Sequence, residues 1–295
     1  MAGRIVVGTD GSESSKRALD WAVAEAGARE AVLQPVIVWQ SPYDYGELRY
    51  VPVDEEQLAE GARKRLEQEI AEAAGEASPA TTVPLVAHGD PAQVLCERSA
   101  SADLLVVGSR GHGGFAGLML GSVSTKCAHH SRCPLVIVRG TADRDYRLVR
   151  RILVGVDGSE GSRRALAWAV DEAALHGASV EALDVWRDPY GADMSLEFDM
   201  EHFRVDRELL LERAQDRLAA AVAEAVAAHP GAEVAPVLLQ GEDTTRVLCE
   251  RSADADLLVV GARGHGGFLR LLPGSASIAC AHHSKCPVVI IPNAG

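Results

Sequence analysis

The chain has 295 residues, of which 47% are hydrophobic and 24% are charged, and this length allows two globular domains of ordinary size. The formal net charge of −13 at pH 7 argues against a nucleic acid or an anionic membrane as the main partner. The first residues lead directly into a strand pattern, and no apolar segment approaches a membrane span, so we expect a cytoplasmic protein without a signal peptide. The six cysteines are then expected to be reduced.

In the first half of the chain, apolar strand patterns alternate with helical patterns. The expected elements, in order, are strand 5–9, helix 14–28, strand 32–39, helix 54–75, strand 83–87, helix 91–100, strand 104–108, helix 122–130 and strand 135–138. Strands that are almost entirely Val, Ile and Leu favour a parallel sheet with helices on both faces. We therefore predict the α/β class: two tandem doubly wound domains, each with a five-stranded parallel sheet that binds ligands beyond the carboxyl ends of its strands.

An internal repeat divides the chain into two similar halves. The segment 4–12 returns at 151–159, shifted by 147 positions, and the segment 95–100 returns at 248–253, shifted by 153 positions. The second copy therefore carries six more residues in its middle part. We expect domains at 1–142 and 148–295, because a repeat of half the chain length indicates duplicated domains. The longest irregular connections, 41–56 and 188–202, are expected to cover the pockets or to make contacts between the domains.

A glycine-rich loop follows the fourth strand of each half. It has the form Gly-x2-Gly-x9-Gly-Ser, with its glycines at 108, 111 and 121 and, in the second half, at 261, 264 and 274. Glycines let backbone N–H groups approach an anion, and the helix that follows offers unpaired N–H donors and a partial positive charge. Asp10 and Gly108 both lie at carboxyl ends of predicted strands, so one pocket collects both residues if the two strands are neighbours.

These features together resemble the universal stress protein family, in its tandem two-domain, ATP-binding, actinobacterial-like form. The resemblance rests on the loop, on the opening Val-Gly-x-Asp-Gly-Ser and on the ending Cys-Pro-Leu-Val-Ile-Val, and it covers nearly the whole chain twice. It implies a Rossmann-like fold of the adenine nucleotide alpha-hydrolase kind. It also implies ATP as the ligand, since the branch of the family without nucleotide lacks this loop. The resemblance further implies that the two domains pair through their last strands, 135–138 and 288–291. Association of two chains into a dimer is also expected.

The resemblance also assigns roles to particular residues. Asp10 and Asp157 correspond to the family's ribose contacts, Val38 and Val185 to its adenine contacts, and the loops to its phosphate contacts. A magnesium ion could accompany the phosphates. The residues expected at the two ATP sites are Gly8, Thr9, Asp10, Val38, Gly108, Arg110, Gly111, Gly121, Ser122, Val123 and Ser124 in the first half, and Gly155, Val156, Asp157, Val185, Gly261, Arg263, Gly264, Gly274, Ser275, Ala276 and Ser277 in the second.

Each of these assignments has a purely structural alternative. Asp10 and Asp157 precede Gly-Ser and a helix, so they could shape a turn or cap the helix. The glycines could serve only a tight connection, although a thirteen-residue loop without a ligand would be unusual. The charged loop residues could screen phosphates or be solvated surface; they are Arg110, His112, Arg263 and His265.

Cysteine and histidine recur in the segments 127–133 and 280–286, where they could bind zinc. The favoured interpretation is structural: the histidines end a helix, where they interact favourably with its dipole, and the cysteines pack as small buried hydrophobes. Four tryptophans recur as matched pairs, which favours packing in the core or between domains; they are Trp21, Trp39, Trp168 and Trp186.

Three functions remain open from the residues. The leading hypothesis is a regulatory protein of the stress response that senses ATP, because two intact loops occur without a catalytic constellation or a phosphate-binding lysine motif. The second is an ATPase or a phosphotransferase that uses Ser122 or Ser275 as acceptor. The third is an interaction module whose pockets are vestigial.

Overall fold

The computed structural model describes residues 3–41, 54–73, 81–111, 120–139, 148–186, 200–263 and 275–293. The strands are β1 (Arg4–Thr9), β2 (Val32–Trp39), β3 (Leu85–His88), β4 (Leu104–Gly108), β5 (Leu135–Val138), β6 (Arg151–Gly155), β7 (Ser179–Trp186), β8 (Val234–Gln240), β9 (Leu257–Gly261) and β10 (Val288–Ile291). The helices are α1 (Glu13–Ala28), α2 (Glu55–Ala73), α3 (Pro91–Ser99), α4 (Ser122–His130), α5 (Glu160–His176), α6 (Met200–Val226), α7 (Thr244–Arg251) and α8 (Ser275–His283). The predicted α/β class is confirmed.

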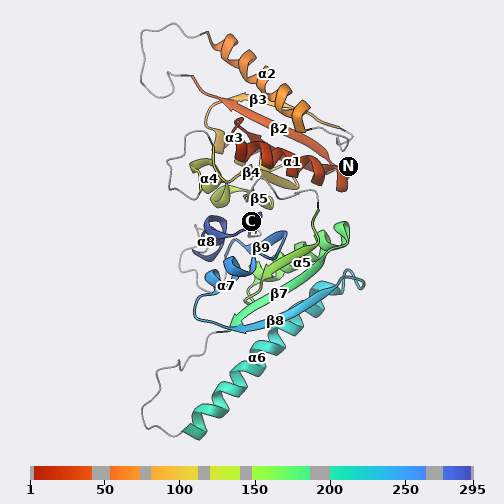
Figure 1. Ribbon diagram of the computed structural model, residues 1–295, viewed down its shortest axis with the longest axis vertical. Helices are drawn as coiled ribbons and strands as arrows, with labels where there is room; N and C mark the ends of the chain where they lie inside the picture. The colour runs from red at the N-terminus through yellow and green to blue at the C-terminus, as the bar shows by residue number, and fades with distance from the viewer. Residues whose placement is uncertain are drawn as a thin grey trace.

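All of these strands belong to one sheet that runs through both halves. Its order is β3-β2-β1-β4-β5-β10-β9-β6-β7-β8, so each half contributes a contiguous block of strands. Pairing is parallel within each half and antiparallel between β5 and β10, where Val136 pairs with Val289. The two halves consequently lie one above the other along the long axis of the molecule, with the β5–β10 pair in the middle (Figure 1). The expected pairing through the last strands is confirmed.

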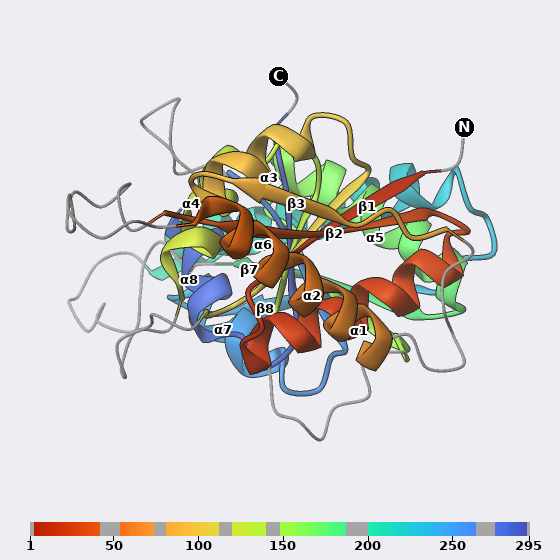
Figure 2. The ribbon, with the colours of Figure 1, turned by 90° about the horizontal axis from the view of Figure 1, so that it is seen from above.

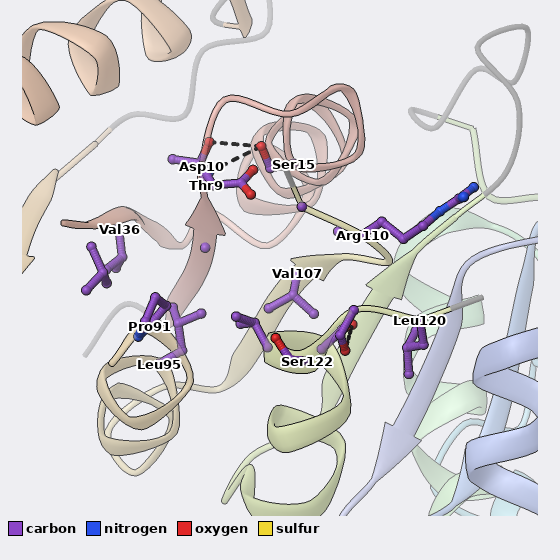
Figure 3. Close-up of a pocket in the computed structure, with 17 residues that line it drawn as sticks. Thr9, Asp10, Ser15, Val36, Pro91, Leu95, Val107, Arg110, Leu120 and Ser122 are labelled. Carbon is purple, nitrogen blue, oxygen red and sulfur yellow. Dashed lines mark hydrogen bonds between the residues drawn. The ribbon is translucent and has the colours of Figure 1, made fainter. Parts of the chain in front are cut away.

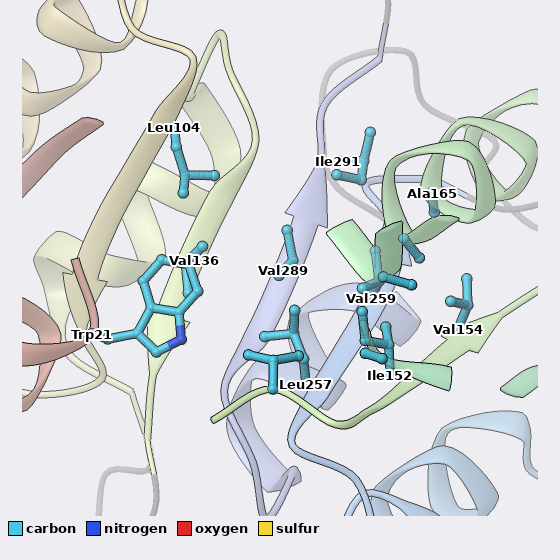
Figure 4. Close-up of a cluster of buried hydrophobic side chains, with 14 of the residues drawn as sticks. Trp21, Leu104, Val136, Ile152, Val154, Ala165, Leu257, Val259, Val289 and Ile291 are labelled. Atoms are coloured by element: carbon cyan, nitrogen blue, oxygen red, sulfur yellow. The ribbon is translucent and has the colours of Figure 1, made fainter. Parts of the chain in front are cut away.

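The helices cover the sheet on both faces, as the strand composition predicts. Alternation along β1 sends Ile5 and Val7 into one apolar cluster and Val6 into the other. The first cluster includes α1 and α5, and the second includes α3, α4, α7 and α8. Seen from above, α3 lies on the opposite side of the sheet from α1 and α2 (Figure 2). The first cluster is continuous across the β5–β10 pair, where Val136 and Val289 face each other with Trp21 nearby (Figure 4).

The third strand differs from the prediction. Strand β3 begins at Leu85 and extends to His88, whereas the sequence predicted a strand at 83–87. The Val83 N–H does donate to the Leu33 carbonyl, but the next β2 residue that faces this edge is Pro35, which has no N–H to donate to Val83, so the ladder is interrupted before the pairing resumes at Leu85. Apart from Pro35 itself, the pattern of Val and Leu residues does not indicate this interruption.

The long connections are shorter than predicted at their ends. Residues 55–56 and 200–202, which the sequence placed in the connections 41–56 and 188–202, already belong to α2 and α6. Most of both connections, 42–53 and 187–199, lies outside the described residues, so their expected role over the pockets stays a prediction. Helix α6 has 27 residues and α2 has 19, in keeping with the longer middle part of the second copy.

A charged cluster joins the halves where α1 packs beside α5. Arg29 of α1 donates to the Glu172 carboxylate of α5, and His176 of α5 lies 3.0 Å from the Glu25 carboxylate of α1. Each carboxylate also has a cation one helical turn away on its own helix. Glu25 is 2% exposed and Glu172 is 1% exposed, so both charges are buried at the boundary.

The protonation states of this cluster follow from its contacts. The carboxylates of Glu172 and Glu25, which accept hydrogen bonds from the protonated ring, raise the pKa of His176 to about 9, although burial opposes the charged form. Burial also disfavours a charged Glu25, but His176 and Arg29 together hold its pKa below the usual value. At Glu172 burial dominates and raises the pKa. The cluster is therefore a set of two acids and two bases whose charges balance across the boundary.

The tryptophans Trp21 and Trp168 lie near this boundary. Trp21 is 2% exposed within the first apolar cluster, and Trp168 packs against the same cluster. The Arg29 guanidinium carbon lies 5.7 Å from the centre of the Trp168 ring, within the range of a cation–π contact. The predicted packing role is confirmed for this pair. Trp39 instead stacks on His88 at the sheet end, with ring centres 4.4 Å apart.

Candidate functional site

A cavity of about 430 Å³ opens beyond the carboxyl ends of β1 and β4 in the first half (Figure 3). These two strands are direct neighbours in the sheet, so Asp10 and Gly108 meet at one edge, as the sequence predicted for adjacent strands. All eleven residues that the sequence proposed for the first half line this cavity: Gly8, Thr9, Asp10, Val38, Gly108, Arg110, Gly111, Gly121, Ser122, Val123 and Ser124. Residues separated by more than one hundred positions in the chain thus share one wall.

The sequence did not identify six further lining residues, which are Ser15, Val36, Pro91, Leu95, Val107 and Leu120. Most of them are apolar and come from elements that the loop motif does not include. The only signal in the sequence was periodicity: Val36 lies two residues before Val38 on the same face of β2. The packing of α3 beside β1 supplies Pro91 and Leu95, and only the folded chain shows it.

Asp10 sits in a turn that joins β1 to α1. Its Oδ1 accepts a hydrogen bond of 3.0 Å from the Ser12 N–H, and Gly11 between them has φ +80°. Ser12 then caps α1 by accepting from the Ser15 N–H at 3.2 Å. Asp10 therefore does shape the turn, which was the structural alternative. The turn nevertheless leaves the Asp10 side chain at the cavity, so the two roles are compatible.

Gly111 approaches the Asp10 side chain closely. A Cβ at position 111 would lie 2.3 Å from Asp10 Oδ2, far inside van der Waals contact. At the strand end, a Cβ at Gly108 would lie 2.7 Å from the backbone carbonyl carbon and oxygen of Ser14. Position 108 therefore requires glycine, because the backbone of Ser14 cannot move aside, whereas a side chain at position 111 would displace the Asp10 carboxylate.

The N-terminus of α4 faces the same cavity. Its N-cap is Gly121, with φ −80° and ψ 164°, and no side chain caps the helix, in contrast to Ser12 at α1 and Asp90 at α3. The first N–H groups of α4 therefore remain for another acceptor within the described residues. Uncapped N–H groups and the helix dipole together favour an anion at this end of the cavity.

The Ser124 hydroxyl has a structural role in the loop. It donates to the carbonyl oxygens of Ser109 and Gly121, at 3.2 Å and 3.0 Å, and the side chain is almost fully buried. The Thr125 hydroxyl likewise donates to the Gly121 carbonyl at 2.8 Å. These bonds fasten the end of the loop to the start of α4, so Ser124 would contact an anion through its backbone N–H.

The second half repeats the turn, the strand pairing and the serine hydrogen bond of the first half where it is described. Asp157 Oδ1 accepts a hydrogen bond of 2.9 Å from the Ser159 N–H, and Ser159 caps α5. Strands β6 and β9 are neighbours, which brings Gly155 and Gly261 to one edge. Ser277 Oγ donates to the Ala262 carbonyl at 3.1 Å, the counterpart of the Ser124 bond. Nine of the residues proposed for this half belong to the described part of the chain: Gly155, Val156, Asp157, Val185, Gly261, Arg263, Ser275, Ala276 and Ser277.

Part of the second loop lies outside the described residues. Gly264 and Gly274 belong to this part, as do His265 and, in the first loop, His112. Their expected contacts with a phosphate remain predictions.

The recurring Cys-His segments close α4 and α8 and lead into the last strands. Their four cysteines are buried and unoxidised. In the described part of the chain, the group of metal-ligand types whose atoms lie within 4.8 Å of one another is Glu25, Glu172 and His176, which includes neither segment. Across the same residues, no helix combines the length and the apolar character that a bilayer crossing requires.

Comparison with known proteins agrees with this architecture. The family model described as "Universal stress protein family" matches residues 1–139 and 149–292. A universal stress protein of Mycolicibacterium smegmatis is 32% identical over 97% of this chain and 96% of its own length. The universal stress protein Rv2623 of Mycobacterium tuberculosis is also 32% identical, over 97% of this chain and 95% of its own.

A solved structure shares the fold over the whole chain. The universal stress protein from Archaeoglobus fulgidus DSM 4304 superposes with a TM-score of 0.68 at 22% identity, covering 99% of this chain and 98% of that one. The sequence matches and the shared fold lead to the same conclusion: the chain belongs to the universal stress protein family and carries two of its domains in tandem.

Proposed function

We propose that this protein binds one ATP molecule in each half and acts as a regulatory nucleotide sensor of the stress response. The observation that carries the proposal is the composition of the first cavity. It combines an apolar wall, a carboxylate and an uncapped helix N-terminus, which are the three surfaces that adenine, ribose and phosphate require.

The apolar wall is formed by β2 and α3. Val36, Val38 and Leu95 give it a flat, aliphatic lining against which an adenine ring would pack. The Asp10 carboxylate stands between this wall and the loop, at a position where it would accept hydrogen bonds from ribose hydroxyls. In the second half, Val185 and Asp157 would take the corresponding roles.

The phosphates would bind at the N-terminus of α4. Backbone N–H groups of Ser122, Val123 and Ser124 would donate to phosphate oxygens, and the glycine at 111 lets the loop approach without a side chain. Arg110 lines the same cavity and would add positive charge. Any magnesium ion would be held by the phosphates near Asp10, the carboxylate that lines this cavity.

A sensing role fits the chemistry of the loop better than a catalytic one. The hydroxyls of Ser124 and Thr125 donate to backbone carbonyl oxygens, which do not activate a nucleophile. We further propose domain boundaries of 1–142 and 148–295, a cytoplasmic location and association of two chains. Occupancy of the pockets would then shift the balance between domain or oligomer arrangements.

The test begins with the protein freshly purified and denatured, and mass spectrometry identifies the nucleotide that is released. We expect ATP at about two molecules per chain, the number that two equivalent pockets require. Calorimetric titration of the nucleotide-stripped protein should give the same stoichiometry.

Single variants assign the two sites. Asp10→Asn and Asp157→Asn should each reduce the titrated stoichiometry to about one, or weaken one of two phases at least tenfold, about 1.4 kcal/mol. Asp216→Asn, an exposed carboxylate on α6, is the matched control and should leave both sites intact. A stripped wild-type protein that takes up no ATP would sink the proposal and favour the interaction module.

A further inference from the structure

The charged cluster between α1 and α5 divides its carboxylate oxygens into two sets. Arg29 donates to one oxygen of each carboxylate, Oε1 of Glu25 and Oε2 of Glu172. The other two oxygens face the His176 ring, whose Nε2 lies 3.0 Å from Glu25 Oε2 and 3.4 Å from Glu172 Oε1. Glu25, Glu172 and His176 thus bring three possible metal-ligand atoms within 4.8 Å of one another.

One of these atoms, Glu172 Oε1, lacks a regular hydrogen bond. A ring nitrogen carries at most one proton, and Nε2 lies closer to Glu25 Oε2, so this proton cannot serve both oxygens equally. Glu172 is 1% exposed, and among the described residues no donor makes a hydrogen bond of regular geometry to its Oε1. Burial removes the water that would otherwise solvate this oxygen, which is unfavourable. A positive centre in contact with all three atoms would remove this cost.

The charges of the cluster favour a cation at this place. When the imidazole is neutral, one net negative charge remains, because two carboxylates outnumber one guanidinium. Arg29 and His176 occupy equivalent positions of the repeat, so the second copy supplies a metal-ligand type where the first supplies a fixed cation. Arg29 also holds both carboxylates in place, as the hydrogen-bonding partners of metal-ligating carboxylates commonly do.

The ligand types and their spacing favour Zn²⁺. Zinc binds imidazole nitrogen and carboxylate oxygen at about 2.0–2.2 Å, so two of its tetrahedral ligands lie about 3.4 Å apart. The measured separations of 3.0 Å and 3.4 Å are close to this value. Ca²⁺ takes about six to eight oxygen ligands and Mg²⁺ requires an octahedral shell, so neither ion suits three buried ligands that include a nitrogen.

The cluster can be reached from the end of α5. His176 is the last residue of this helix, and its side chain is 12% exposed. The next residue, Gly177, has φ +64°, and a Cβ at this position would meet no described atom within 4 Å. An ion can therefore enter past His176, and a water molecule from the same side can complete its tetrahedral shell.

We propose that Glu25, Glu172 and His176 bind one zinc ion between the halves, with water as the fourth ligand. The ion takes the place of the ring proton, which otherwise lies between the same atoms. Because its ligands come from α1 and α5, it joins the two halves and stabilises the folded chain. The inference goes beyond nucleotide binding and does not depend on it, since none of these residues lines the cavity.

Titration of the full chain with ZnCl₂ tests the site, after nucleotide and metal have been removed from the protein. Calorimetry should show that His176→Gln lacks one equivalent of zinc that the wild type binds. Glutamine keeps an N–H donor toward the carboxylates, so the metal-free variant should retain the fold. His229→Gln removes a histidine from an exposed pair with Asp171 and should keep this equivalent. Equal stoichiometry and affinity in the wild type and His176→Gln overturn the proposal.

Thermal unfolding tests the stabilisation. Zinc at about 100 times Kd should raise the Tm of the wild type and of His229→Gln by about 4 °C. It should not raise the Tm of His176→Gln, and Mg²⁺ at the same concentration should leave the wild-type Tm unchanged. A rise of the same size in His176→Gln, or with Mg²⁺, contradicts a zinc site at this cluster.

Cobalt(II) distinguishes this site from the cysteines. Co²⁺ occupies tetrahedral zinc sites, and a thiolate ligand adds an intense near-ultraviolet charge-transfer band to its visible absorption. Protein loaded with one Co²⁺ should show the visible bands without the thiolate band, and His176→Gln should lose the visible bands. A thiolate band in the wild type would place the ion at the segments 127–133 or 280–286 instead, and the proposal would be wrong.

Discussion

His176 on α5 lies 3.0 Å from the Glu25 carboxylate on α1, so an ion pair buried between the halves joins two helices that the repeat makes equivalent. The repeat places Glu25 opposite Glu172 and Arg29 opposite His176, each at a separation of 147 positions. The four residues therefore occupy equivalent positions in the two halves, but the two cations differ. Arg29 keeps its charge throughout the ordinary pH range, whereas His176 can lose its proton. This asymmetry makes the boundary between the halves sensitive to pH.

Stability should depend on pH through His176. Its pKa in the folded state, about 9, lies above the value of about 6.5 expected for an unfolded chain. The contribution of His176 is therefore fully present below about pH 6.5 and is lost as the pH rises through about 9, to a limit of about 3 kcal/mol. Denaturant unfolding between pH 6 and 10 should show this decline in the wild type and a much weaker one in His176→Gln.

His229→Gln is the matched control for this measurement. His229 forms a similar pair with Asp171 at 2.8 Å, but the His229 side chain is 40% exposed. Solvent screens this pair, so the His229→Gln variant should show the same decline of the free energy of unfolding with pH as the wild type. A wild-type profile that is flat from pH 7 to pH 10 would contradict the role assigned to His176.

Glu172→Gln should weaken the boundary between the halves. The substitution removes the carboxylate that accepts from Arg29, and the remaining carboxylate of Glu25 cannot balance two cations. We expect the free energy of unfolding to fall by about 2 kcal/mol. The comparison variant is Glu250→Gln: its pair with Arg246 is exposed and i,i+4, so about 0.3–0.5 kcal/mol is expected. Equal effects of the two variants would show that burial does not strengthen the cluster.

Gly108→Ala should separate β4 from α1. The new Cβ would lie 2.7 Å from the Ser14 carbonyl group, and a backbone atom cannot yield as a flexible side chain does. We expect a loss of about 1–3 kcal/mol together with weaker ATP binding. Gly61→Ala on α2 is the opposite case, since its Cβ meets no atom within 4 Å, and it should stabilise the protein by about 0.5–1 kcal/mol. Thermal unfolding should show a lower Tm than the wild type for Gly108→Ala and a higher Tm for Gly61→Ala.

In each half an arginine side chain lies against the glycine of the turn that follows the first strand: Arg65 against Gly11 and Arg217 against Gly158. The carboxylate that pairs with this arginine differs between the halves. Arg65 pairs with Glu69 on the same helix, at 3.1 Å, whereas Arg217 reaches Asp184 on β7, at 2.8 Å. Burial raises the pKa of Asp184, and Arg217 opposes this rise. Arg217→Met should therefore destabilise the protein by about 1–3 kcal/mol at pH 8.

The pH dependence identifies the cause of this loss. Without Arg217 the pKa of Asp184 in the folded protein should rise further, so its protonation stabilises the variant at low pH and the stability falls as the pH increases. The difference in the free energy of unfolding between the wild type and Arg217→Met should consequently be smaller at pH 5 than at pH 8. Arg213→Met, an exposed position on the same helix, should show neither effect. A gap that does not change with pH would point to lost packing of the arginine stem instead.

The first cavity shows how far local patterns reach. The loop motif and the opening Asp-Gly-Ser mark most of the residues that line it, because glycine spacing and strand ends are local properties of the chain, and the family resemblance completed the eleven with Val38 on the second strand. Pro91 and Leu95 line the same cavity, yet their sequence reads only as the start of a helix. Which face of α3 meets β1 depends on the packing of two distant elements, and no local pattern encodes that choice.

The sequence by itself determined the order of strands and helices, the duplication and the position of the loops, since hydrophobic periodicity and turn chemistry act between near neighbours. Only the tertiary structure decided which distant side chains meet: the Glu25–His176 pair across the halves, and the Arg217–Asp184 pair that replaces an anchor on the same helix. These contacts join residues more than thirty positions apart. Their physical basis is burial, which selects partners only when the sheet and its helices have brought them together.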